Sequence, residues 1–162
     1  MSDVGIRLVN SKEEADEVCK LAPAAGSEQH EIDEMIKRDR IFIAKRDKKT
    51  IGFVALRTIK QENAIEISGL ATVEDERGRG IAKLLIKYAE KTAQGMNTKK
   101  LVVRTSNDNI PALALYQKNG FKISEVRLGA MVQHHGGKEV RGWKGTPVRD
   151  EIILEKTLKQ SA

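Results

Sequence analysis

The segment from Arg77 to Ala82 reads R-G-R-G-I-A and lies between a β-like run and a helical pattern rich in Leu, Ile and Ala. Glycines at 78 and 80 let the main chain approach a ligand closely. The first amide N–H groups of the following helix lack partners within the helix and lie at its positive dipole end. These features predict a loop that binds a pyrophosphate through backbone amides. A plain strand-to-helix turn, which glycine also favours, is the alternative.

A second segment, from Asn109 to Phe121, reads N-I-P-A-L-A-L-Y-Q-K-N-G-F. We expect a short helix with Pro111 in its first turn and with Gly120 as its stop signal. Tyr116 lies near the end of this helix. A tyrosine on the inner face of an amphipathic helix is by itself usually a core residue.

Together the two segments resemble the motifs of the GNAT superfamily of acyl-CoA N-acyltransferases. The cofactor motif of that family has Arg or Gln, two residues, Gly, one residue, then Gly or Ala, and Arg77, Gly80 and Ala82 fill it. The second motif has Asn before a helix that ends in Leu-Tyr and Gly-Phe. It is met by Asn109, Leu115, Tyr116, Gly120 and Phe121. The resemblance covers residues 50–128 strongly and the remainder by the order of elements.

Hydrophobic periodicity predicts one domain over residues 1–162 in which strands and helices alternate. Strands are expected over 5–9, 40–45, 51–59, 64–73, 100–105, 121–128 and 151–157, and helices over 11–22, from 27, from 81 and over 109–121. Ser11 and Glu14 are expected to form a capping box, and Ser27 to cap the second helix. The resemblance implies an α+β GNAT fold. In that fold a mixed, mostly antiparallel seven-stranded sheet with a splayed central strand pair is flanked by about four helices.

The resemblance also implies acetyl-CoA as co-substrate. Its pantetheine arm is expected to pair like an added strand with the 64–73 strand, in the gap before the 100–105 strand. An internally paired, continuous sheet is the alternative. An N–H near Ala71 is the expected oxyanion donor. The predicted cofactor-binding residues are Leu70, Ala71, Thr72, Arg77, Gly78, Arg79, Gly80, Ile81, Ala82, Asn109 and Tyr116.

Acetylation of an amine requires a base, because an alkylamine with a pKa near 10.4 is about 99.9% protonated at neutral pH. Period-2 geometry places Glu66, Ser68, Leu70 and Thr72 on one face of their strand. Glu66 lies eleven residues before Arg77, where the histone-acetylating branch of the family carries its general base. We therefore expect Glu66 to be the catalytic base, directly or through water. Glu62 is the second choice, and a solvated strand-face glutamate is the alternative.

Two further roles come from the resemblance. Tyr116 matches the family tyrosine that protonates the departing thiolate, and Asn109 is expected to cap its helix. In the branch that acetylates protein N-termini, the base lies at the position of Arg104, which cannot act as a base. This disfavours a ribosomal-protein acetyltransferase of that type. Arg104 either holds an acidic group of the acceptor or pairs with Asp108.

The segment from Gly129 to Arg149 borders the acceptor pocket in the family. His134, His135 and Trp143 are its candidates for acceptor contact. Adjacent histidines on an extended segment point opposite ways, and the sequence nearby offers no further zinc ligands, so no metal is expected. Arg149 and Asp150 are candidates for tying this segment down by an ion pair.

The composition agrees with an enzyme of this kind. The chain has 162 residues, a net charge of +6 and six aromatic residues, and its lysines and arginines are scattered among carboxylates. This pattern disfavours nucleic-acid binding. The absence of a signal pattern and of an apolar run near about 20 residues favours a cytoplasmic protein without membrane contact. Cys19 is the only cysteine and is interpreted as a structural thiol.

The sequence therefore predicts an N-acetyltransferase that transfers an acetyl group directly from acetyl-CoA to a primary amine of a small molecule or peptide. A non-catalytic acyl-CoA sensor or scaffold is the alternative, and a homodimer is a possible assembly. The acceptor itself is not predicted, because the first two helices and the 129–149 segment are where the resemblance is weakest.

Overall fold

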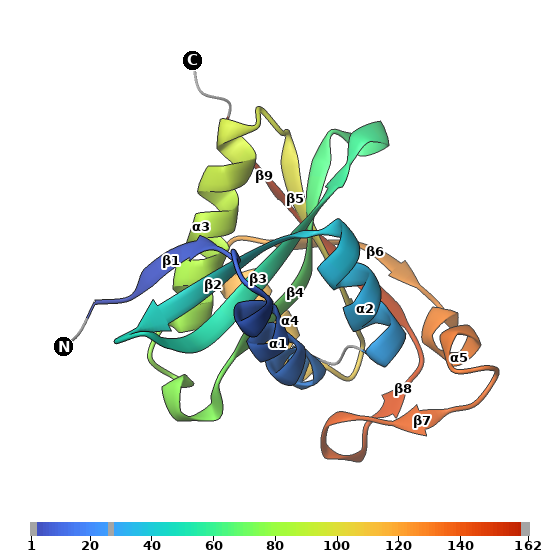
Figure 1. The fold of residues 1–162 in the computed structure, drawn as a ribbon. Helices are drawn as coiled ribbons and strands as arrows, with labels where there is room; N and C mark the ends of the chain where they lie inside the picture. The colour runs from blue at the N-terminus through green and yellow to red at the C-terminus, as the bar shows by residue number, and fades with distance from the viewer. Residues whose placement is uncertain (1–2, 26–27, 160–162) are drawn as a thin grey trace. The chain divides into compact units, whose positions relative to one another are not determined.

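The computed structural model describes residues 3–25 and 28–159. The chain divides into two compact units, one that runs to Lys99 and resumes at Leu158, and one from Lys100 to Thr157. Figure 1 shows the elements of each unit. Within the described ranges, no helix is both long enough and apolar enough to span a membrane.

The first unit contains an antiparallel sheet in the strand order β1-β2-β3-β4. Its strands are β1 (Gly5–Leu8), β2 (Arg40–Arg46), β3 (Lys49–Ile59) and β4 (Ala64–Thr72). The turn between β2 and β3 has positive φ at Asp47 (50°) and Lys48 (67°). That backbone follows the right-handed twist of a hairpin, and β2 and β3 pair as one.

Helices cover both faces of this sheet. They are α1 (Lys12–Leu21), α2 (Gln29–Arg38) and α3 (Ile81–Gly95), and Figure 1 shows α1 and α2 on one face and α3 on the other. On the first face, Val18 and Met35 belong to a buried cluster with Phe53 of β3. On the other, the ring of Phe42 in β2 lies 4.9 Å from that of Tyr88 in α3. Alternate side chains of each strand thus supply two core layers.

The helix caps differ from expectation in detail. Ser11 accepts a hydrogen bond from the Glu14 N–H at 3.2 Å, but the Glu14 carboxylate accepts from the Asn10 N–H rather than completing the box with Ser11. Ser27 lies outside the described residues. The N-cap of α2 is Glu28, which forms a capping box with Glu31.

The second unit contains an antiparallel sheet in the order β5-β9-β6. Its elements are β5 (Lys100–Ser106), α4 (Ile110–Lys118), β6 (Lys122–Arg127), α5 (Ala130–His134), β7 (Val140–Arg141), β8 (Pro147–Val148) and β9 (Glu151–Thr157). All seven predicted strands are present, and the α+β fold class is confirmed. The structure adds α5 and the β7–β8 hairpin, which were not predicted. Each is too short to give a periodic hydrophobic signal.

Glu14 is a buried carboxylate that joins three segments of the first unit. It pairs with Arg7 of β1 and, at 3.0 Å, with the Nζ of Lys45 in β2. The hydrogen bond from Arg7 is the main cause that lowers the pKa of Glu14 from its ordinary value of 4.5 to about 2, and burial opposes it. The ionised form of Glu14 therefore stabilises the folded unit.

We expect Glu14→Gln to lower the free energy of unfolding at neutral pH and to flatten its decline in acid. Because the folded pKa lies below the unfolded one, this stabilisation is complete above pH 4.5 and is lost as the pH falls toward about 2. Urea denaturation across that range measures it. Glu13→Gln, an exposed neighbour in the same turn, should retain the wild-type profile. Parallel profiles for Glu14→Gln and wild type would contradict the assignment.

Candidate active site

Strand β4 presents the expected face. Glu66, Ser68, Leu70 and Thr72 are partly exposed, and the residues between them are buried. The register with β3 shifts between Ala55, which pairs with Gly69, and Leu56, which pairs with Ile67. Ser68 is therefore the extra residue of a β-bulge. The one local sign of this irregularity is a glycine, Gly69, inside a strand pattern.

The β3–β4 ladder also fixes which amides of β4 face outward. The Val73 N–H donates to the Ile51 carbonyl of β3 at 2.9 Å. Hydrogen-bonding direction alternates along an antiparallel strand, so the Ala71 N–H also faces β3. The amides of Leu70 and Thr72 face the opposite edge of β4. This geometry favours Leu70 or Thr72 over Ala71 as a donor to a ligand.

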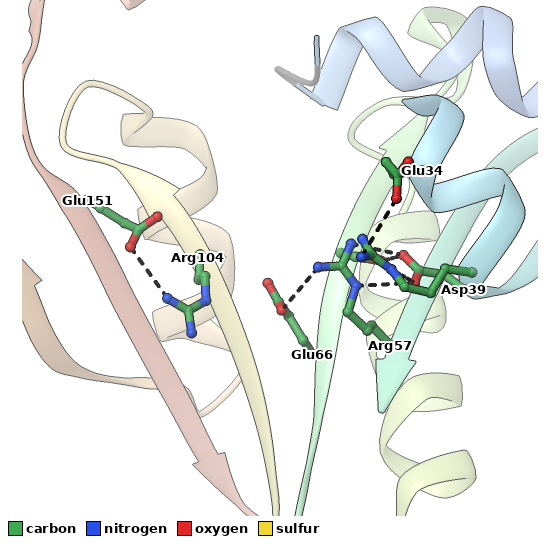
Figure 2. Close-up of polar contacts among 8 residues, drawn as sticks. Glu34, Asp39, Arg57, Glu66, Arg104 and Glu151 are labelled. Atoms are coloured by element: carbon green, nitrogen blue, oxygen red, sulfur yellow. Dashed lines mark hydrogen bonds and ion pairs between the residues drawn. The ribbon is translucent and has the colours of Figure 1, made fainter. Parts of the chain in front are cut away.

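A polar cluster surrounds Glu66 (Figure 2). Arg57 of β3 lies opposite Glu66 in the register, with its Nη1 3.9 Å from the Glu66 Oε1. The same guanidinium donates from Nε and Nη2 to Asp39, at 3.2 and 3.4 Å. Ser68 also donates to Asp39, at 2.6 Å. The sequence did not indicate a role for Asp39 or Arg57. Asp39 lies 18 positions from Arg57 and 29 from Ser68, and no local pattern links them.

Glu62 and Glu66 have different surroundings. Glu62 is exposed and ends a 3-10 turn, η2 (Lys60–Glu62). The Glu66 side chain is only 12% exposed and lies beside Arg57. Of the two carboxylates, Glu66 is therefore the more enclosed and the one with a cation beside it.

The loop before α3 has the predicted backbone. Gly78 and Gly80 have φ values of 78° and 82°, and a Cβ at either position would meet open space. Gly80 is the N-cap of α3 and supplies no capping side chain; among the described residues no side chain makes the cap hydrogen bond. The first amides of α3, which begins at Ile81, therefore receive no capping hydrogen bond from Gly80 at the positive end of a 15-residue helix.

Charged side chains hold this loop in place. Glu76, the last residue of the 3-10 turn η3 (Glu74–Glu76), is buried. It pairs with Arg46 of β2 at 3.3 Å and with Arg79 at 3.6 Å. Arg77 donates from Nε to the Thr72 carbonyl at 3.4 Å. The loop thus combines anchored ends with an arginine, Arg79, whose side chain is 64% exposed.

In the second unit, Asn109 has the predicted capping role. Its Oδ1 accepts a hydrogen bond from the Ala112 N–H at 3.2 Å, and Pro111 lies in the first turn of α4. Tyr116 of the same helix is 6% exposed, and its ring meets that of Phe121 edge-on at 5.4 Å. Burial raises the pKa of the Tyr116 phenol above its ordinary value. The hydroxyl therefore keeps its proton at neutral pH.

The expected pair of Arg104 with Asp108 is wrong. Arg104 pairs with Glu151 of β9 at 3.4 Å, as Figure 2 shows. Asp108 instead accepts hydrogen bonds from the Ser106 hydroxyl and, at 3.1 Å, from the Trp143 N–H. One oxygen of Asp108 thus accepts a local hydrogen bond from Ser106, and the other accepts one from Trp143, 35 positions away.

The extended backbone expected at the two histidines of the 129–149 segment is wrong. The chain is helical there. His134 ends α5 and His135 caps it, and their rings meet edge-on at 5.1 Å. The Trp143 side chain lies under the Nζ of Lys144, 4.6 Å from the ring centroid, and Trp143 is 39% exposed. In a helix, neighbouring side chains follow one another round the axis and do not point to opposite faces. The rings of His134 and His135 can therefore meet.

Asn107 holds the end of this segment, and sequence reasoning missed it. Its Oδ1 accepts from the N–H groups of Arg149 and Asp150 at 2.8 and 3.0 Å, and its Nδ2 donates to the Pro147 carbonyl at 2.9 Å. Asp150 accepts from the Gly129 N–H at 2.9 Å, and Arg149 pairs with Glu139 at 3.0 Å. Arg149 therefore holds the segment in place through Glu139, and Asp150 does so through the Gly129 N–H.

We expect Asn109→Ala to lower the free energy of unfolding by about 1 kcal/mol, because it removes an N-cap hydrogen bond. Asn109→Ser retains a capping oxygen and should recover most of the loss. Urea denaturation measures both variants. Equal stability of Asn109→Ala and wild type would remove the capping role.

Three comparisons extend these observations. Residues 10–121 match the acetyltransferase (GNAT) family. The chain is 28% identical over 131 residues to the "Uncharacterized N-acetyltransferase YvbK" of Bacillus subtilis (strain 168). The aligned region covers 80% of this chain and 83% of that protein. It is similar to the solved structure of an IAA acetyltransferase from Bacillus cereus ATCC 14579, with a TM-score of 0.83, 31% identity and coverage of 96% of this chain and 100% of that one.

A GNAT family acetyltransferase from Elizabethkingia anophelis, solved with acetyl-CoA bound, gives a TM-score of 0.85 at 25% identity and covers 98% of this chain and 100% of that chain. The matched family region includes β4, the 77–82 loop, α3 and α4, where the predicted motifs lie. The chain therefore belongs to the GNAT acetyltransferase family.

Proposed function

We propose that this protein transfers an acetyl group directly from acetyl-CoA to a primary amine of a small molecule or peptide. The observation that carries the proposal is the loop before α3, where two glycines with positive φ expose backbone amides that no side chain caps within the described chain. The acetyl-CoA bound to the similar Elizabethkingia anophelis acetyltransferase supports this choice of donor.

The chain's residues fit the co-substrate at two places. Amides from Gly78 to Ala82 hold the pyrophosphate, and the exposed Arg79 adds a positive charge. Along β4, the outward backbone N–H groups of Leu70 and Thr72 donate hydrogen bonds to the co-substrate. One of them pairs with the pantetheine arm, and the other stabilises the charge that develops on the thioester oxygen. Leu70 and Thr72 are both partly exposed, which agrees with this role.

Glu66 acts as the base in this proposal. It accepts the proton of the acceptor ammonium, directly or through water, and so generates the nucleophilic amine. Its partial enclosure and its position beside Arg57 support this role over Glu62, which is exposed.

Tyr116 acts as the acid. When the thioester breaks, the sulfur leaves as a thiolate, and a protonated phenol can donate a proton to it. Burial keeps the Tyr116 pKa high, so the proton is present at neutral pH. The amine attacks the thioester carbon directly, and no covalent intermediate with the protein is formed.

Thiol release from acetyl-CoA tests the function. Small amines, amino acids, polyamines and peptides should be offered in turn, and the acetylated product identified by mass spectrometry. We expect amine-dependent release with at least one class. Binding of coenzyme A without release for any acceptor would support the alternative, a non-catalytic acyl-CoA sensor.

We expect Tyr116→Phe to lower kcat by about 100-fold, because general-acid catalysis has that order of effect. Its affinity for acetyl-CoA, measured by calorimetry, should change little. Tyr88→Phe is the matched control, since Tyr88 packs its ring on Phe42 in the core. An undiminished kcat for Tyr116→Phe would remove this residue from the acid role.

A further inference from the structure

We propose that Asp39 and Arg57 position Glu66 for catalysis, by holding a guanidinium near the base but out of hydrogen-bonding range. The inference rests on the proposed function, because it concerns the carboxylate assigned there as base. Asp39 is the C-cap of α2, Arg57 belongs to β3 and Glu66 belongs to β4. All three lie in the first unit.

The contacts of Arg57 define its orientation. Asp39 accepts hydrogen bonds from two of its three guanidinium nitrogens, Nε at 3.2 Å and Nη2 at 3.4 Å. The third nitrogen, Nη1, is 3.9 Å from the Glu66 Oε1. In Figure 2 the guanidinium lies between the two carboxylates. Since the guanidinium is planar and rigid, Asp39 fixes where its remaining edge points.

Asp39 is itself held firmly. Its side chain is 0% exposed, and it accepts from the Ser68 hydroxyl at 2.6 Å, at the β-bulge two residues beyond Glu66. Its backbone N–H donates to the Met35 carbonyl, which closes the last turn of α2. The Nε of Arg38 lies 3.5 Å from Asp39, and Arg38 also pairs with Glu34 at 3.9 Å. The network therefore joins α2, β3 and β4.

The spacing has a chemical consequence. A free guanidinium would make a bidentate pair with Glu66, occupy its oxygens and lower its basicity. At 3.9 Å, Nη1 is too far for a hydrogen bond but near enough to favour the ionised carboxylate. Arg57 thus favours the charged form of Glu66 without donating a hydrogen bond to its oxygens. Asp39 maintains that balance by competing with Glu66 for Arg57.

Two substitutions should shift Glu66 in opposite directions. Arg57→Met removes the cation, so the titration midpoint of Glu66 should rise by roughly half to one pH unit. Asp39→Asn releases Arg57 toward Glu66, so the midpoint should fall. Ser68→Ala loosens Asp39 without changing any charge and should give a smaller fall. Arg57→Lys keeps the charge and should restore most of the wild-type midpoint.

Carbon-13 NMR of glutamate carboxyls measures these midpoints in protein without acetyl-CoA, and Glu66→Gln identifies the signal. Arg40→Met is the matched control, because Arg40 on the neighbouring strand contacts the Met96 sulfur instead of this network. Midpoints that move in opposite directions for Arg57→Met and Asp39→Asn would support the proposal. An unmoved midpoint in Arg57→Met would overturn it. If Asp39→Asn does not fold, Ser68→Ala supplies the second direction.

The acetyl-transfer assay separates this inference from the function on which it rests. With an accepted amine, the acid limb of the kcat profile should move in the same direction as the midpoint, and the KM for acetyl-CoA should stay unchanged. Turnover with an unmoved Glu66 midpoint would overturn the positioning role alone. Absence of turnover with every amine would overturn the proposed function, and the NMR titration would still decide whether Asp39 and Arg57 control Glu66.

Discussion

The antiparallel pairing of β3 with β4 is the interaction on which the first unit depends. Its register places Phe53 opposite Ala71 on the side of the core, and Arg57 opposite Glu66 among the polar side chains. The bulge at Ser68 brings a hydroxyl to Asp39. A shift of one residue would exchange the buried and polar faces of β4. The packing of the core and the arrangement of the candidate base therefore have the same cause.

Buried carboxylates paired with arginine recur at the junctions of this unit. Glu14 joins α1 to β1, Asp39 joins α2 to β3 and β4, and Glu76 joins the loop before α3 to β2. An ionised carboxylate removed from water is costly unless it is paired. Each pair thus specifies where a helix or loop meets the sheet. At Asp39 this structural requirement also sets the surroundings of Glu66.

The sequence predicted the regular elements well, because each carries a local signal. Alternation gave Glu66, Ser68, Leu70 and Thr72 their common face, and Pro111 with Asn109 marked the start of α4. The glycine loop was recognised for the same reason. The contacts of Asp39 with Arg57 and of Asn107 with Pro147 were not predicted, since they join residues 18 and 40 positions apart. Arg104 was assigned the wrong partner because β9, which carries Glu151, is distant in sequence.

Amide NMR of the protein titrated with coenzyme A tests whether backbone donors before α3 bind the diphosphate of an acyl carrier. We expect saturable shifts that are largest at Gly78, Gly80, Ile81 and Ala82, accompanied by shifts at Leu70 and Thr72, whose amides face away from β3. Spectra that remain unchanged at these amides while coenzyme A is added in excess would contradict it.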